Sequence, residues 1–279
     1  MLDRPLRSAL YIPGSKERAL EKARSLPVDV ILFDLEDAVS PDAKIAARDT
    51  LYAALEEGYG PRMTIVRINA LDTQWGKEDA AAVAAMKCDA VLLPKVNGPD
   101  DIDELARRVP VKAIWAMMET PQGVLNAAAI AAHPRLEGFV MGTNDLAKDL
   151  RTRSRAALMV ALQHCLLAAR AQGVAAIDGV YNAFQDTDGL RAECEEGRDM
   201  GFDGKSLIHP AQIEIANACF GPTEAEVALA RRQIDAFEAA MREGQGVAVV
   251  DGKIVENLHI ETARATLAQA DMIARLESA

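Results

Sequence analysis

The amino-acid sequence predicts an α/β fold, a closed (β/α)8 barrel of the TIM type with a C-terminal helix–hairpin–helix extension. Short apolar or β-branched runs alternate with longer helical patterns, which is the rhythm of repeated βα units. The length of 279 residues suits a single barrel of roughly 250 residues. An open doubly wound sheet is the alternative, but no GxGxxG or Walker A pattern is present, which favours the barrel.

Eight strands are predicted along the chain, each followed by a helical segment. The strands are Ser8–Ile12, Val30–Asp34, Thr64–Ile68, Ala90–Pro94, Ala113–Met117, Gly138–Met141, Ala175–Ile177 and Gly204–Ile208. The helices are Lys16–Ser25, Ala43–Glu57, Lys77–Lys87, Asp100–Arg108, Pro121–Ala132, Arg155–Gln172, Asp188–Met200 and Pro210–Cys219. Eight such pairs are the count that closes a barrel.

The alternation of short apolar runs and helical segments stops near Thr223. We therefore expect a catalytic barrel over residues 1–222 and an extension over residues 223–279. A long charged helix, Glu224–Arg242, leads into a glycine-rich stretch whose Asp251-Gly252 pair predicts a hairpin turn. A last helix, Leu258–Glu277, follows. From these residues alone, packing of the extension against the barrel is favoured over an arm that reaches a neighbouring active site.

Composition excludes several classes of partner. A net charge of −11 and only 4% aromatic residues argue against nucleic acid and against an anionic membrane surface. No apolar run is long enough to span a membrane, and the first ten residues lack the apolar segment of a secretory signal. The four cysteines are far apart and form no CxxC pair, as expected of reduced core thiols. We therefore expect a cytoplasmic protein.

Candidate site residues follow from a rule of this fold, because the working residues of such barrels sit at the C-terminal ends of the strands and in the loops beyond them. The rule selects Pro13, Gly14, Ser15, Asp34, Glu36, Asp37, Arg67, Asn69, Lys95, Glu119, Asn144, Asp145, Asp178, Lys205 and His209.

Two carboxylates at the ends of adjacent predicted strands indicate a divalent cation. Glu119 follows AIWAMM and Asp145 follows GFVMGTN. Mg²⁺ commonly takes one or two protein carboxylates and completes its shell with substrate and water. The alternative is that each acid merely caps the helix that follows it.

Arg67 ends an otherwise apolar strand, where an unpaired guanidinium would be costly. It forms either a salt bridge to Asp34 or Glu36, or a bidentate clamp on a substrate carboxylate or enolate oxygen. Asp34, Glu36 and Asp37 repel one another unless a cation or arginine offsets them. Bound waters of a metal would also stabilise these acids. Otherwise they are a solvated surface loop.

A second group of residues suggests phosphate binding. Gly14-Ser15 opens a helix with basic Lys16, Arg18 and Lys22 nearby, although the same pattern serves as an ordinary helix cap. Lys95 follows VLLP and is either a cofactor-binding cation or a solvated loop lysine. No GxSxG elbow or cysteine–histidine pairing supports a covalent mechanism.

The order of these motifs resembles the citrate lyase β-subunit-like branch of the HpcH/HpaI aldolase/citrate lyase superfamily, near the malyl-CoA and citramalyl-CoA lyases. The motifs are RSALYIPGS, ILFDLEDAVSPDAKIAAR, VRIN, AVLLPKV, METPQGVLN, GTNDLAKDL and GFDGKSLIHPAQI. The resemblance implies a TIM barrel with Mg²⁺ bound by Glu119 and Asp145.

The resemblance also implies roles for the residues around that metal. Arg67 would contact keto-acid or enolate oxygens, with Glu36 and Asp37 supporting the metal waters and the arginine. The CoA-binding side would include Pro13, Gly14, Arg18 and Lys22.

The resemblance further implies a homotrimer or hexamer in which the C-terminal segment covers a neighbour's active site. The related lyases present an aspartate there within a DG-x-M-I-D segment, whereas this chain reads Asp251-Gly252-Lys253-Ile254-Val255-Glu256. Glu256 is then the candidate for proton transfer. The added methylene puts the reaction in question more than the fold, because small displacements of an acid/base group affect rate.

The activity we expect is a Mg²⁺-dependent carbon–carbon lyase that cleaves or forms a 3-hydroxyacyl-CoA such as malyl-CoA or citramalyl-CoA, with a keto acid and an acyl-CoA as partners. One alternative is a thioesterase of malyl-CoA type on the same scaffold. Another is a citrate lyase β subunit acting on a carrier-bound citryl thioester. An aldolase of free hydroxy-keto acids is a more distant alternative.

Overall fold

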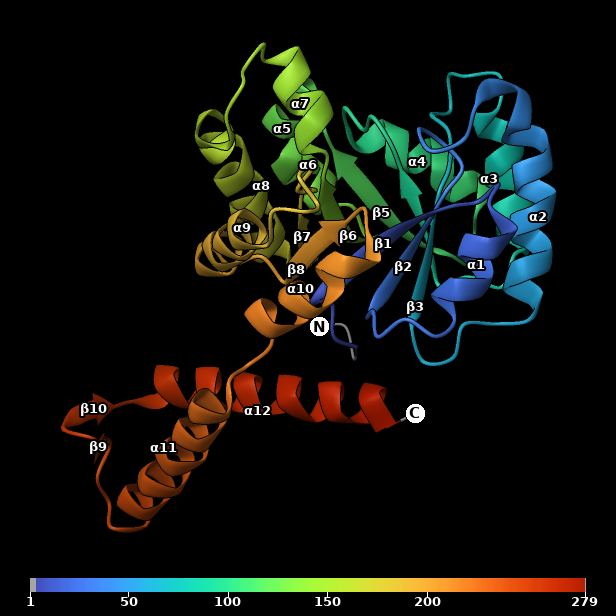
Figure 1. Cartoon of the computed structure of the whole chain (residues 1–279). Helices are drawn as coiled ribbons and strands as arrows, with labels where there is room; N and C mark the ends of the chain where they lie inside the picture. The colour runs from blue at the N-terminus through green and yellow to red at the C-terminus, as the bar shows by residue number, and fades with distance from the viewer. Residues whose placement is uncertain (1–3, 279) are drawn as a thin grey trace.

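The computed structural model describes residues 4–278 and contains a closed barrel of eight parallel strands in the order β1 to β8, as the sequence predicts (Figure 1). The strands are β1 Ser8–Pro13, β2 Val30–Asp34, β3 Met63–Arg67, β4 Ala90–Leu93, β5 Ala113–Met118, β6 Leu136–Met141, β7 Ala175–Asp178 and β8 Gly204–Leu207.

Strand residues alternate between two apolar layers, because successive side chains of a strand point to opposite faces. In β2, Val30 and Leu32 belong to the cluster that fills the barrel, whereas Ile31 and Phe33 belong to the cluster between strands and helices. Trp115 is fully buried in the inner cluster. Its ring would lie 2.6 Å from a Cβ atom at residue 138, so this position requires Gly138.

The helices of the barrel surround it on the outside (Figure 1). They are α1 Glu17–Ala23, α2 Lys44–Glu56, α3 Gly76–Ala85, α4 Pro99–Arg108, α5 Pro121–Leu125, α6 Ala127–Ala131, α7 Thr143–Asp149, α8 Met159–Gln172, α9 Thr187–Met200 and α10 Ile213–Phe220. Two details differ from the prediction. The predicted helix Pro121–Ala132 is broken at Asn126, and α7 is an additional short helix between β6 and α8.

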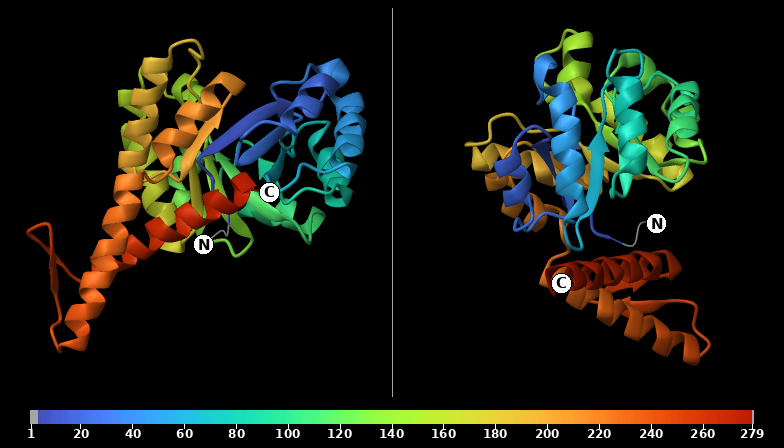
Figure 2. Two further views of the ribbon diagram at one scale, coloured as in Figure 1. Left: turned by 60° about the horizontal axis from the view of Figure 1, so that its bottom comes forward. Right: turned by 90° about the vertical axis from the view of Figure 1, so that its right-hand side faces the viewer.

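The extension comprises α11 Glu224–Arg242, β9 Ala248–Val250, β10 Lys253–Val255 and α12 Asn257–Ser278. The predicted hairpin turn is present, with positive φ at Asp251 (50°) and Gly252 (76°). Figures 1 and 2 show α12 passing beneath the barrel, while α11 and the hairpin project away from it. Near the C-terminal end of α12, Glu277 accepts hydrogen bonds from Arg7, which directly precedes β1. The extension therefore packs at the N-terminal end of the barrel, opposite the strand ends that carry the candidate site.

No helix among residues 4–278 combines the length and apolarity that a membrane crossing requires.

Candidate functional site

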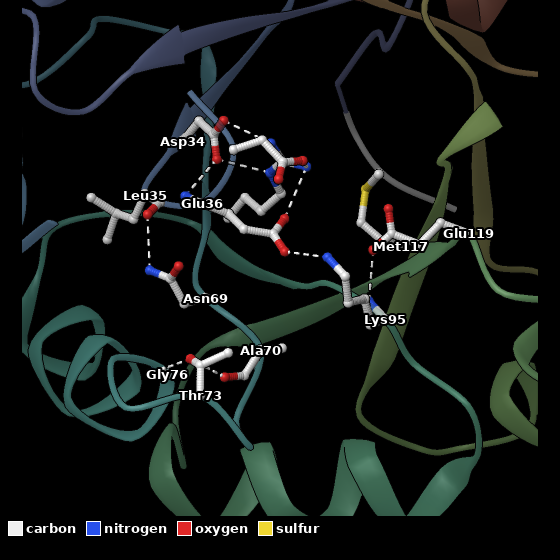
Figure 3. A network of polar contacts seen from close by, with 12 residues as sticks. Asp34, Leu35, Glu36, Asn69, Ala70, Thr73, Gly76, Lys95, Met117 and Glu119 are labelled. Carbon is white, nitrogen blue, oxygen red and sulfur yellow. Dashed lines mark hydrogen bonds and ion pairs between the residues drawn. The ribbon is translucent and has the colours of Figure 1, made fainter. Parts of the chain in front are cut away.

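The carboxyl ends of β2 to β5 bring a network of charged side chains together (Figure 3). Asp34 and Arg67 are the last residues of β2 and β3, while Lys95 and Glu119 follow β4 and β5. The sequence places these residues far apart, and the neighbouring positions of the four strands in the barrel bring them to one rim.

Arg67 and Asp34 form a buried bidentate ion pair. Nε of Arg67 donates to Oδ1 of Asp34 over 2.8 Å, and Nη2 donates to Oδ2 over 2.7 Å. Burial alone would raise the pKa of Asp34, but the Arg67 guanidinium outweighs it and holds that pKa below its ordinary value, helped by backbone N–H groups of Glu36 and Ala38. In this structure the arginine thus makes the barrel-end salt bridge that the sequence offered as the alternative to a substrate clamp.

The remaining donor nitrogen of Arg67, Nη1, faces Glu36 and Asp37, which follow β2. Nη1 lies 3.1 Å from Oε2 of Glu36 and 3.2 Å from Oδ2 of Asp37. Glu36 is buried, so it is not a solvated surface acid, whereas the Asp37 side chain is 63% exposed. The Glu36 oxygen is close to Nη1 but not aligned for a hydrogen bond. Arg67 therefore offsets all three acids, with Asp37 the least firmly held.

Lys95 links Glu36 to Glu119, as Figure 3 shows. Its Nζ donates to Oε1 of Glu36 over 2.6 Å, and its backbone N–H donates to Oε1 of Glu119 over 2.7 Å. Burial, followed by repulsion from Glu36, raises the pKa of Glu119 to about 7. A buried carboxylate beside a second one is a place where a cation lowers the free energy of the charged form.

Asp145 lies in the first turn of α7, directly beyond β6, and is partly exposed. Gly142 begins this turn and packs against Glu119, since a Cβ atom there would lie 2.3 Å from Glu119 Cβ and 2.6 Å from its Oε2. The capping alternative is wrong for Glu119, because Thr120 caps α5 by accepting a hydrogen bond from Gly123. Gly142, not Asp145, occupies the N-cap position of α7.

The donor set fits Mg²⁺. Glu119 uses one oxygen for the Lys95 N–H, and its other oxygen faces the turn that carries Asp145. Among residues 4–278 no cluster of three or more His, Cys, Asp or Glu side chains suits a metal ion. An ion held by Glu119 and Asp145 would take its remaining ligands from substrate and water, as Mg²⁺ commonly does.

The residues predicted to bind CoA lie on the β1 side of the rim. Gly14 donates its N–H to the Asp34 carbonyl over 2.9 Å and packs against Leu35, which leaves no room for a side chain. Pro13 ends β1, and Arg18 and Lys22 are exposed on α1. The Gly14 N–H is therefore used within the protein, and a CoA contact on this side remains a prediction for the exposed basic groups.

Glu256 lies in the extension, exposed, at the residue before α12. Glu256 lies between β10 and α12 in the extension, which packs at the N-terminal end of the barrel, so it lies on the side away from the strand-end network of its own chain (Figure 1). A contact between Glu256 and such a network would require a second copy of the protein.

Two other residues selected by the strand-end rule do not join the site, and Lys205 proves to be the second residue of β8 rather than its end, whereas Asp178 does end β7. Asp178 and Lys205 pair with each other over 2.9 Å and with Arg155 and Glu193 outside the strands. A Cβ at Gly197 of α9 would lie 2.9 Å from Asp178, so this side chain points toward the helix layer. Both residues stabilise the barrel wall instead.

Sequence reasoning missed two residues that shape the network. The Tyr11 ring lies 5.0 Å from the Arg67 guanidinium, and its hydroxyl contacts Sδ of Met117. Lys44 donates to the backbone carbonyls of Leu35 and Glu36. Tyr11 could have been found from the sequence, because the alternation of β1 directs its side chain into the barrel. Nothing in the local sequence pattern indicates a role for Lys44.

Comparison with known proteins identifies the family of the chain. The model of the HpcH/HpaI aldolase/citrate lyase family matches residues 7–210. A (3S)-malyl-CoA thioesterase of Cereibacter sphaeroides is 65% identical over 274 residues, covering 97% of this chain and 96% of its own. The citrate lyase subunit beta of Escherichia coli is 37% identical over 285 residues, covering 96% of this chain and 94% of its own.

A solved structure of CitE from Mycobacterium tuberculosis, in complex with magnesium, acetoacetate and coenzyme A, superposes with a TM-score of 0.81. It is 31% identical and the match covers 97% of this chain and all of that one. The Mycobacterium tuberculosis citrate lyase beta subunit with oxaloacetate and magnesium gives a TM-score of 0.72 at 32% identity, covering 79% of this chain and 99% of its own. Taken together, the family model, the relatives and the barrel show that the chain belongs to the HpcH/HpaI aldolase/citrate lyase family.

Proposed function

We propose that this enzyme hydrolyses a 3-hydroxyacyl-CoA thioester of malyl-CoA type, with Mg²⁺ held by Glu119 and Asp145. The observation that carries the proposal is the 65% identity to a (3S)-malyl-CoA thioesterase over nearly the whole of both chains. It favours the thioesterase alternative over the carbon–carbon lyase that the sequence first suggested. The citrate lyase relatives, at 37% identity, keep the lyase as a second candidate.

The reaction consumes one water: its oxygen bonds to the thioester carbon, the C–S bond breaks, and the thiolate of CoA takes up a proton. Mg²⁺ would polarise substrate oxygens and stabilise the negative charge that develops on them. Arg67 keeps two hydrogen bonds to Asp34, and its Nη1 exchanges the exposed Asp37 for a substrate oxygen. Asp37 is 63% exposed, so water can solvate its carboxylate once Nη1 has turned to the substrate. Arg18 and Lys22 supply positive charge for the phosphates of CoA.

A direct assay tests the reaction. The purified protein is incubated with Mg²⁺ and malyl-CoA, and free thiol and keto acid are followed in parallel. We expect free CoA to appear without glyoxylate. Glyoxylate without free CoA would contradict hydrolysis and establish a lyase. If neither product forms, a carrier-bound substrate would be favoured.

We further propose that the extension, residues 223–279, acts as an arm on a neighbouring subunit of a trimer or hexamer. The hairpin exposes apolar Val249 (67%) and Ile254 (61%), and Glu256 follows it directly. Exposed apolar side chains gathered at the tip of a projecting segment are a common mark of a protein interface. Glu256 would then supply or accept the proton at the neighbour's active site.

Glu256→Gln is expected to lower kcat by about 10²–10⁴-fold with little change in KM, because the amide cannot transfer a proton. The matched control is Glu261→Gln, an exposed glutamate one helical turn further on. Mixed oligomers of the Glu256→Gln and Glu119→Gln variants should regain part of the activity, since some sites then combine an intact arm with an intact metal site. Full activity of Glu256→Gln, or no regain in verified mixed oligomers, would contradict the arm.

A further inference from the structure

Lys95 has a backbone conformation that is unusual for its residue type. Its φ of 54° places it in the left-handed region, where a side chain is sterically disfavoured. Arg151 and Asp251 are the other non-glycine residues with positive φ within residues 4–278, and Asp251 forms the hairpin turn. A conformation of this kind persists only where the surroundings hold it, and it is concentrated at functional sites.

The conformation directs the Lys95 backbone N–H at Glu119. The hydrogen bond to Oε1 is 2.7 Å long and the Glu119 side chain is buried, so the carboxylate has one fixed orientation. Its Oε2 then faces the Gly142 turn that carries Asp145. With one oxygen engaged by β4 and the other directed at β6, Glu119 is set to bind an ion in common with Asp145.

The Lys95 side chain is also fixed, by an ion pair with Glu36. Nζ lies 2.6 Å from Oε1 of Glu36, and this ion pair joins the end of β4 to the β2 loop. The ammonium also lies between two acids that repel each other, Glu36 and Glu119. Since this charge already has a buried partner, it is less suited to a phosphate of CoA than the exposed lysine and arginine of α1.

We propose that Lys95 is a positioning residue for the metal site, which orients Glu119 through its left-handed backbone N–H and is itself fixed by Glu36. The inference rests on the proposed function in one respect, the assignment of Glu119 and Asp145 as metal ligands. It predicts that the shape of the backbone at residue 95 matters more to metal affinity than the ammonium does.

Two variants separate these contributions. Lys95→Gly and Lys95→Val both lack the ammonium, but glycine adopts a positive φ freely and the β-branched valine resists it. Titration calorimetry with MgCl2 and no substrate gives the metal Kd of each. We expect Lys95→Val to raise this Kd by about 10–100-fold, the range found when a residue that orients a metal ligand is changed. Lys95→Gly should stay much closer to the wild type.

Each result of this experiment has one meaning. Equal affinity of the wild type and Lys95→Val would overturn the inference while leaving the metal site intact. Equal weakening in both variants would also overturn it, since the charge would then be responsible. No binding by the wild type would refute the metal site itself. If Lys95→Val does not fold, Lys95→Ala takes its place against Lys95→Gly, because the two differ only by the methyl group that opposes positive φ.

A kinetic measurement distinguishes positioning from cofactor binding. Under the proposal, raising the Mg²⁺ concentration restores much of the kcat of Lys95→Val, and the KM for the CoA ester changes little. An increase in that KM with the metal Kd unchanged would instead return Lys95 to the CoA site and overturn the inference.

Discussion

Glu119→Gln is expected to remove Mg²⁺-dependent turnover, lowering kcat/KM by about 10²–10³-fold or more, the range observed when charge stabilisation of a transition state is lost. The amide keeps the size of the side chain and can still accept the Lys95 N–H, but it lacks the negative charge that binds a cation. Calorimetric titration with MgCl2 and the thioester assay measure the two effects separately.

The control for this variant is Glu104→Gln on α4. Glu104 faces Arg108 four residues later in a partly exposed pair, and such pairs contribute little. Its metal affinity and turnover should match the wild type. Asp145→Asn should reproduce the loss seen with Glu119→Gln. Mg²⁺-dependent turnover that survives in Glu119→Gln would refute the assignment of this ligand.

Arg67→Met is expected to lower the free energy of unfolding by about 3–5 kcal/mol, because removing one partner of a buried ion pair leaves the other charge unpaired. Asp34 is almost fully buried and would keep only its two backbone N–H donors. Denaturant unfolding at neutral pH measures the loss. Activity should also fall, since Glu36 and Asp37 lose the same cation.

The control variant also removes the charge of Asp34, the ion-pair partner of Arg67. The double variant Arg67→Met/Asp34→Asn should recover part of the lost stability, because it removes the charge left unpaired in the single variant. The arginine holds the folded-state pKa of Asp34 below its unfolded value of about 3.9, so the pair stabilises the fold above that pH. This stabilisation disappears as the pH falls through the folded-state pKa. A destabilisation by Arg67→Met that is as large in acid as at neutral pH would contradict this account.

The barrel could be predicted because its pattern is local. Each strand is a short apolar run that is buried on both faces, as VILFD in β2 shows, and each is followed by a helical segment. The hairpin was equally local, since an Asp-Gly pair suits positive φ at both turn positions. The break of the fifth predicted helix at Asn126 and the short helix α7 were not foreseen.

The position of charged residues at the barrel rim could be predicted only in part. Parallel strands end at the same rim, so the strand-end rule selects Glu119, Lys95 and Arg67, and the network joins these three through Glu36. Asp178 also ends a strand, yet its side chain points to the outer side of the wall and pairs there with Lys205, the second residue of β8. Successive side chains of a strand point to opposite faces. An error of one residue in a predicted strand therefore moves a charged side chain from the site to the helix layer.

By itself, the sequence determined the eight-stranded barrel, the extension with its hairpin, and the carboxylate-rich rim, because these depend on apolar periodicity, turn residues and strand order. Tertiary structure alone decided that Arg67 is engaged by Asp34 and that Lys95 adopts a left-handed backbone to hold Glu119. It also decided that the extension with Glu256 packs at the N-terminal end of the barrel, away from the site of its own chain. Such pairings join residues 24 or more positions apart. Their free energy depends on burial and direction in three dimensions, which no local pattern encodes.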